Sequence, residues 1–119
     1  MSISARDEQV LQHIIMYCSQ VEKTIESLEI TSVNFKENFI YRNAVSMPLL
    51  QIGELAKKLT ADFREEYDEM PWRSIAGMRD RFAHDYGKMN VEAIWETASH
   101  EIPILHKYCE SVIKKSLIM

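Results

Sequence analysis

Apolar residues recur at steps of three and four near the start of the chain, and this spacing constrains the fold more than any other feature. Such spacing places side chains on one face of a helix, so it predicts an amphipathic helix of the kind found in helical bundles. Ser4 is predicted to cap this helix, with Asp7 and Glu8 in the first turn, where the helix dipole favours negative charge. The residues of the apolar face are Leu11, Ile14, Cys18, Val21, Ile25 and Leu28.

A second long helix is predicted to follow. A polar segment interrupts the first pattern, and Asn34, with Glu37 three residues later, is predicted to cap a helix that runs to about Leu59. Pro48 is expected to kink this helix, because proline removes a backbone hydrogen bond and presses on the preceding turn. Gly53 indicates close contact with a neighbouring helix.

The second half of the chain predicts one short helix and two longer ones. The acidic segment at residues 60–70 is expected to form the short helix. A helix of about four turns is predicted to start at Pro71, which suits the first helical position, and to end before Gly87. Asn90 is predicted to cap the last long helix, which Pro103 bends or restarts.

Length and composition agree with one helical domain that spans residues 1–119. The chain has three glycines and three prolines, and 46% of its residues are apolar, which favours a few long elements. The predicted fold class is therefore all-α: an antiparallel bundle of four long helices plus one short helix. The polar N-terminus does not resemble a signal peptide and no apolar run is long enough to cross a bilayer, so we expect a cytoplasmic protein without a membrane partner.

Charge and cysteine content argue against nucleic-acid binding by overall electrostatics and against a metal site or disulfide at the cysteines. A net charge of −4 argues against binding nucleic acid by overall electrostatics, so any RNA contact must be local. Cys18 and Cys109 lie in apolar helical patterns without a CxxC motif, so we expect buried thiols, with neither a metal site nor a disulfide. One segment, residues 72–88, has four cations against two acids, and the cations are Arg73, Arg79, Arg81 and Lys88.

The helix predicted at residues 71–86 carries the side chains with the most chemical capability. Asp80 and His84 are four residues apart and share a face, so the carboxylate can orient the imidazole and raise its pKa. Arg79 and Tyr86 are seven apart and nearly eclipsed. Arg79 and His84, in contrast, are about 140° apart around an ideal helix.

The order of these residues resembles the motif of the HEPN superfamily and, within it, the HepT toxin family. That motif is an arginine, a polar residue, three further residues and then His-x-Tyr, and here it reads RDRFAHDY from Arg79 to Tyr86. The flanking pairs Pro71-Trp72 and Ile94-Trp95, followed by Pro103, are also similar to the family. Where the family most often has Asn after the arginine, this chain has Asp80.

The resemblance implies a metal-independent ribonuclease toxin without a cofactor, in which Arg79, His84 and Asp80 are catalytic. It further implies a homodimer, with a higher oligomer left open, and an MntA-like minimal nucleotidyltransferase as antitoxin. This partner would silence the toxin by transferring AMP onto Tyr86. The RNA substrate is expected to contact the basic residues around the motif, which are Arg73, Arg81 and Lys88.

Cleavage of RNA without a metal needs a base, an acid and cations for the charge that builds on phosphorus. One motif helix offers a single histidine, His84, and places Arg79 to one side of it. Two motif helices that meet across a two-fold axis would supply two of each around one cleft. This requirement agrees with the dimer that the resemblance implies. Arg79 would bind the phosphate through two parallel N–H donors, which lysine cannot do.

Other interpretations remain open at this point. The charged residues of the motif could form a solvated face of ion pairs. The chain could also be a non-catalytic helical adaptor that docks a minimal nucleotidyltransferase, or, less favoured, a phosphorelay module. Glu96 and His100 are spaced four apart, but the chain lacks the paired Glu-x-x-His motifs of two-metal bundles, so no metal site is predicted.

Overall fold

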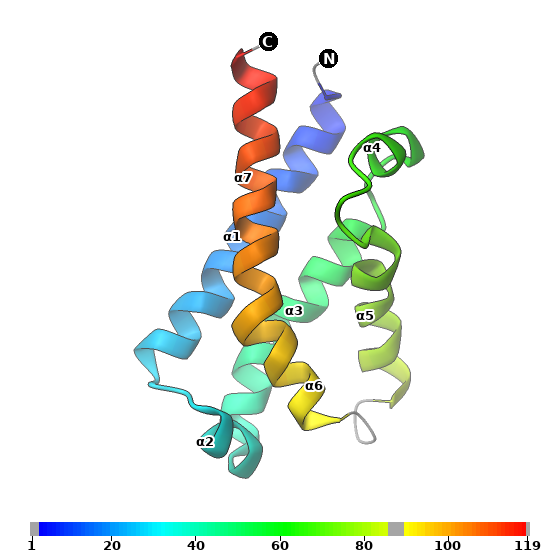
Figure 1. Ribbon diagram of the computed structural model, residues 1–119. Coiled ribbons are helices and arrows are strands. Elements are labelled where there is room, and N and C mark those ends of the chain that lie inside the picture. The colour runs from blue at the N-terminus through cyan, green and yellow to red at the C-terminus, as the bar shows by residue number, and fades with distance from the viewer. Residues whose placement is uncertain (1–2, 86–89, 119) are drawn as a thin grey trace.

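The computed structural model describes residues 3–85 and 90–118, and for residues 81–85 it describes the backbone alone. Its described part is helical and contains no strand, which confirms the all-α prediction. Four longer helices form the frame, and consecutive ones run in opposite directions with both termini at the same end (Figure 1). They are α1 (Ala5–Ser27), α3 (Phe39–Ala56), α5 (Trp72–Asp85) and α7 (Ile102–Ile118).

Helix α1 forms the centre of the bundle, because it packs against both α3 and α7. Its buried face follows the predicted spacing from Leu11 to Val21. Leu28 departs from the prediction and is 43% exposed, because the helix ends at Ser27 and the chain turns there. In this turn Glu29 adopts a left-handed conformation with φ of 51°, and the N–H of Ile30 donates to the carbonyl of Ile25 at 2.9 Å.

The predicted continuous helix from Asn34 to Leu59 is wrong, since two helices occupy this region. Helix α2 (Ser32–Glu37) is capped by Thr31, and Asn34 is the third residue of its capping box. The Asn34 side chain accepts from the N–H of Thr31 at 2.7 Å, and the Thr31 hydroxyl accepts from the N–H of Asn34 at 3.2 Å.

A second asparagine separates α2 from α3. Asn38 has extended backbone geometry, and its side chain accepts from the N–H of Ile40 at 2.9 Å, so it caps a new helix. Pro48 lies inside α3 and is buried, and the helix ends at Ala56, three residues before the predicted end. Competition from asparagine side chains for backbone hydrogen bonds explains the break.

The short acidic helix is present as α4 (Ala61–Glu66), capped by Thr60. A buried carboxylate ties its start to the beginning of α1. Asp7 is only 3% exposed, and its two oxygens accept from the Thr60 N–H at 2.9 Å and the Thr60 hydroxyl at 2.7 Å. Asp7 therefore joins two segments that are far apart in sequence.

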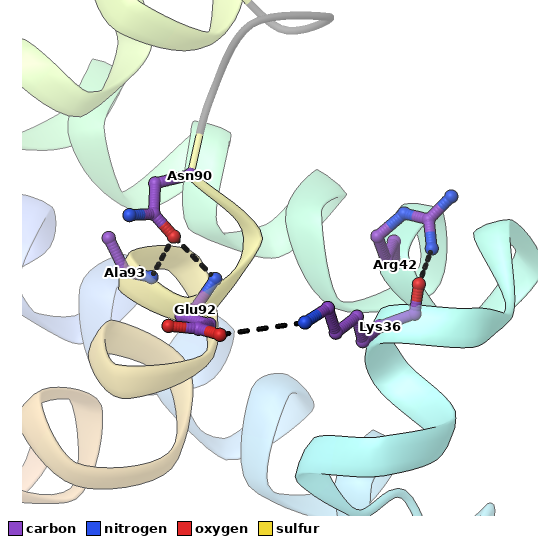
Figure 2. Close-up of polar contacts among 5 residues, drawn as sticks. All are labelled: Lys36, Arg42, Asn90, Glu92 and Ala93. Atoms are coloured by element: carbon purple, nitrogen blue, oxygen red, sulfur yellow. Dashed lines mark hydrogen bonds and ion pairs between the residues drawn. The ribbon is translucent and has the colours of Figure 1, made fainter.

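The last helical region has three parts: α6 (Val91–Glu96), a π-helical turn η2 (Thr97–Glu101) and α7. Asn90 caps α6 as predicted, since its side-chain oxygen accepts from the N–H groups of Glu92 and Ala93 (Figure 2). Pro103 has no N–H to bond back to Ser99, and the wider π turn immediately before it accommodates this missing bond. The restart expected at Pro103 is thus observed.

An exposed ion pair connects α2 with α6 (Figure 2). Lys36 Nζ lies 3.6 Å from a carboxylate oxygen of Glu92, and Arg42 donates to the carbonyl of Lys36 at 2.6 Å. The ion pair thus joins α2 to the start of α6, whereas the bond from Arg42 joins α3 to α2. None of the helices within the described residues is long and apolar enough to span a membrane.

Candidate active site

Helix α5 carries the candidate site, and its N-terminal half is anchored in the core. Trp72 is 3% exposed, and its indole N–H donates to the carbonyl of Tyr67 at 2.7 Å. Helical hydrogen bonding begins at Pro71, whose carbonyl accepts from the N–H of Ile75 at 3.0 Å. Pro71 therefore precedes the helix by one position instead of starting it, and Gly87, predicted to end it, lies outside the described residues.

Close packing against α3 fixes the position of α5. A β-carbon at Gly53 would lie 2.9 Å from the backbone nitrogen of Arg79 and 3.1 Å from the carbonyl oxygen of Ile75. Only glycine permits such an approach without a shift of backbone atoms. The prediction that Gly53 marks a close helix contact is confirmed, and the contact lies directly at the motif arginine.

Four charged side chains from α5 and the C-terminal end of α3, including its C-cap residue Lys57, meet beside this contact. Arg79 Nε lies 3.2 Å from Glu54 Oε2, and Arg79 Nη1 lies 3.5 Å from Asp80 Oδ1. Lys57 donates to the same Asp80 oxygen at 2.8 Å. The side chains of Arg79 and Asp80 are 42% and 54% exposed, so both are reachable from solvent. We call Glu54, Lys57, Arg79 and Asp80 the charged cluster.

The charged cluster keeps Asp80 ionised. The hydrogen bond from Lys57 is the largest cause that lowers the pKa of Asp80. Desolvation opposes it, and the Lys57 charge and the Arg79 guanidinium lower the pKa further. A carboxylate held in this form only accepts hydrogen bonds. Asp80 can therefore orient a donor group placed within its reach.

The remaining predicted site residues are only partly described. The backbone of His84 and Arg81 lies in α5, but their side chains are outside the described set, so the predicted Asp80–His84 contact stays a prediction. Tyr86 and Lys88 lie outside the described residues altogether. Arg73 is exposed near the start of α5, about 9 Å along the helix from Arg79, and does not join the charged cluster.

Sequence reasoning missed Glu54 and Lys57, which hold Arg79 and Asp80. Their spacing of three residues places them on one side of the C-terminal end of α3, where Lys57 is the C-cap, and both follow Gly53, which was recognised as a contact point. A search for opposite charges beside that glycine would have identified them as candidates. The residues that Glu54 and Lys57 contact could not be named, because these contacts depend on the position of α5 along α3.

Other polar and apolar features lie away from the charged cluster. Glu96 and His100 form an exposed ion pair of 3.2 Å, and the described residues contain no group of three or more His, Cys, Asp or Glu side chains that could hold a metal ion. Cys18 and Cys109 are free and buried as predicted, and burial raises the pKa of the Cys109 thiol to about 12 and that of Cys18 further.

The bundle also contains a hollow of about 200 Å³ between the start of α5 and the segment formed by η2 and α7. Its walls are mostly apolar and include Ile75, Met78 and Ile102. Arg79 and Asp80 do not line this hollow. It is therefore separate from the candidate site.

The known proteins that this chain resembles are named as ribonucleases. A protein of Caldanaerobacter subterraneus subsp. tengcongensis named "Putative RNase" is 34% identical over 105 residues, which cover 88% of this chain and 92% of that protein. A protein of Methanocaldococcus jannaschii with the same description is 36% identical over 104 residues, 87% of this chain and 84% of its own length. A "Probable ribonuclease HepT" of Thermococcus cleftensis is 38% identical over 71 residues, 60% of this chain and 64% of that protein.

No solved structure matches the chain. A family model described as Ribonuclease HepT-like, however, matches residues 14–112, which include the helices of the charged cluster and the whole Arg79–Tyr86 motif. The chain belongs to the HepT-like ribonuclease family.

Proposed function

We propose that this protein is a metal-independent endoribonuclease, the toxin of a two-gene toxin–antitoxin module, with its active site shared between the two subunits of a homodimer. The names of the relatives, which describe RNases, support the reaction class. The Arg79–Tyr86 motif supports the location of the site. We expect the protein to act in the cytoplasm on RNA.

The observation that carries this proposal is the presentation of Arg79. Its side chain is 42% exposed, and its guanidinium contacts two carboxylates, Glu54 at 3.2 Å and Asp80 at 3.5 Å. These contacts use Nε and Nη1, and a guanidinium has five N–H donors in all. Donors therefore remain that can bind a phosphate, and the two carboxylates limit the movement of the side chain before the substrate arrives.

The other catalytic roles follow from the chemistry of RNA cleavage. His84 would transfer protons at the 2′-hydroxyl and at the leaving oxygen, and Asp80 would orient the imidazole. Because one chain supplies one His84, a second motif helix from the partner subunit would supply the second proton-transfer group. Arg73, Arg81 and Lys88 would contact the RNA backbone around this groove.

Regulation by a partner protein completes the proposal. An MntA-like minimal nucleotidyltransferase would transfer AMP onto Tyr86, two residues after His84. The added phosphate carries negative charge into a site built to bind the phosphates of RNA, so it would repel the substrate as well as obstruct it.

Cleavage of a labelled single-stranded RNA by the purified full-length protein in EDTA tests the enzymatic part. We expect cleavage by the wild type, and a loss of about 10²–10⁴-fold in His84→Ala, the range typical of a positioned acid–base group. His100→Ala is the matched control, since His100 is an exposed histidine of η2 paired with Glu96. Absence of cleavage by the wild type would favour the adaptor function, and equal cleavage rates in the wild type and His84→Ala would contradict a catalytic role of His84.

Mass spectrometry of the protein co-expressed with a nucleotidyltransferase encoded beside it tests the regulatory part. We expect AMP adducts on Tyr86 of the wild type. In Tyr86→Phe these adducts should be absent from position 86. Unmodified Tyr86 in an inactive complex would contradict the proposed mechanism of silencing.

A further inference from the structure

One oxygen atom joins two cations in the charged cluster. Asp80 Oδ1 accepts from Lys57 Nζ at 2.8 Å and lies 3.5 Å from Arg79 Nη1. Two cations this close would repel each other without the carboxylate between them. Asp80 therefore keeps the lysine that caps the C-terminus of α3 and an arginine from α5 side by side.

The side chains of Lys57, Arg79 and Asp80 are too exposed for their ion pairs to add much to stability. Lys57, Arg79 and Asp80 expose 36%, 42% and 54% of their side chains. Ion pairs with this much solvent contact contribute little to stability, because water and salt screen them. Packing of α3 on α5 rests on the close contact at Gly53 instead, so the cation pair is available for another role.

The geometry leaves Lys57 able to bind an anion. An ammonium group has three N–H donors, and the bond to Asp80 uses one of them. Glu54 contacts Arg79 at Nε, and Glu54 lies three residues before Lys57, the C-cap of α3. Two carboxylates thus contact the guanidinium, and the flexible lysine lies next to it, an arrangement suited to a tetrahedral anion such as phosphate.

We infer that Lys57 is a further substrate-binding residue of the proposed ribonuclease site and contacts an RNA phosphate together with Arg79, while Asp80 holds the two cations together. The inference rests on the proposed function and extends the site from the motif helix to the C-terminal end of α3. The ligand that Lys57 would bind is a phosphodiester group of the polyanionic RNA substrate. No covalent step is assigned to Lys57.

Steady-state kinetics and the salt dependence of binding test the inference. We expect Lys57→Ala to raise KM for a short single-stranded RNA about tenfold, as removal of one charge-assisted hydrogen bond should, with kcat changed less than about threefold. Lys57→Arg should restore KM to within about threefold, because it keeps the charge. Lys58→Ala is the matched control, since it removes the same charge from the next residue, which has no contact with Asp80 among the described interactions.

RNA binding by His84→Ala, with and without Lys57→Ala, gives a readout that a purely structural role would not change. For single-stranded RNA the slope of log K against log salt should become shallower by about 0.7 for each phosphate that the protein no longer binds. An unchanged slope and KM in Lys57→Ala would overturn the inference, and so would equal effects of Lys57→Ala and Lys58→Ala. A wild type that binds RNA with this Lys57 dependence but does not cleave it would instead overturn the proposed ribonuclease function.

Discussion

The backbone nitrogen of Arg79 lies so close to Gly53 that a β-carbon at position 53 would approach it to 2.9 Å. This contact sets the position of α5 along α3. Because Glu54 and Lys57 follow Gly53 within four residues, the same contact brings them to Arg79 and Asp80. The arrangement of the charged cluster therefore depends on one glycine.

Gly53→Ala is expected to destabilise the protein and to displace Arg79. Overpacking against backbone atoms costs about 1–3 kcal/mol, whereas alanine in a helix interior is favoured over glycine by about 0.5–1 kcal/mol. We expect overpacking to prevail and to lower the free energy of unfolding by about 1 kcal/mol. Urea unfolding measures this change, and a variant as stable as the wild type would contradict the close contact.

Asp7→Ala is expected to weaken the link between α1 and α4. Asp7 accepts two hydrogen bonds from Thr60 while almost fully buried, and hydrogen bonds to a charged group contribute about 1.5–3 kcal/mol. We therefore expect a loss of about 2–3 kcal/mol in unfolding free energy. Asp62→Ala, an exposed residue in the first turn of α4, should change stability by less than about 1 kcal/mol. Similar losses in the two variants would contradict a special role of Asp7.

The pKa of Asp80 should report its bond to Lys57. Because the folded-state pKa is lowered, the stabilising contribution of Asp80 is present above the unfolded-state pKa and is lost as the pH falls through the folded-state value. NMR titration of the carboxyl carbon should give a midpoint below the ordinary value of 3.8. Lys57→Ala should move that midpoint upward, and an unmoved midpoint would contradict the contact.

Glu29→Gly is expected to stabilise the turn after α1. Glu29 holds φ at 51°, a conformation that costs most residues about 1–2 kcal/mol and that glycine adopts readily. Allowing for the greater entropy of glycine in the unfolded chain, we expect a gain of about 0.5–1 kcal/mol. Glu26→Gly, the same exchange within α1, should instead destabilise by about 1 kcal/mol. Thermal unfolding of both variants measures the difference, and a destabilised Glu29→Gly would contradict the left-handed turn.

Much of the fold could be predicted from patterns that act over short distances. The spacing of Leu11, Ile14 and Cys18 predicted the buried face of α1, and Ser4 and Asn90 cap helices as expected. The break at Asn38 was missed, because the apolar pattern continues across it and only the side-chain bond to Ile40 starts the new helix.

The candidate site also contains residues that could be predicted from the sequence and residues that could not. Arg79 and Asp80 could be named from the motif, since all of its residues lie on one helix. Glu54 and Lys57 could not be assigned, because their contacts join two helices whose relative position is set by packing at Gly53. A sequence shows which charges a helix carries, but not which charges of another helix lie opposite them.

The activity of mixed dimers tests most directly whether two motif helices form one active site. A wild-type chain and an Arg79→Ala/His84→Ala chain, carrying different affinity tags, are co-expressed and isolated together, with a doubly tagged wild-type dimer as control. A shared groove predicts that the mixed dimer cleaves RNA at less than about one tenth of the control rate, because every groove lacks one histidine and one arginine. Half of the control rate, or a protein that does not dimerise, would contradict the account.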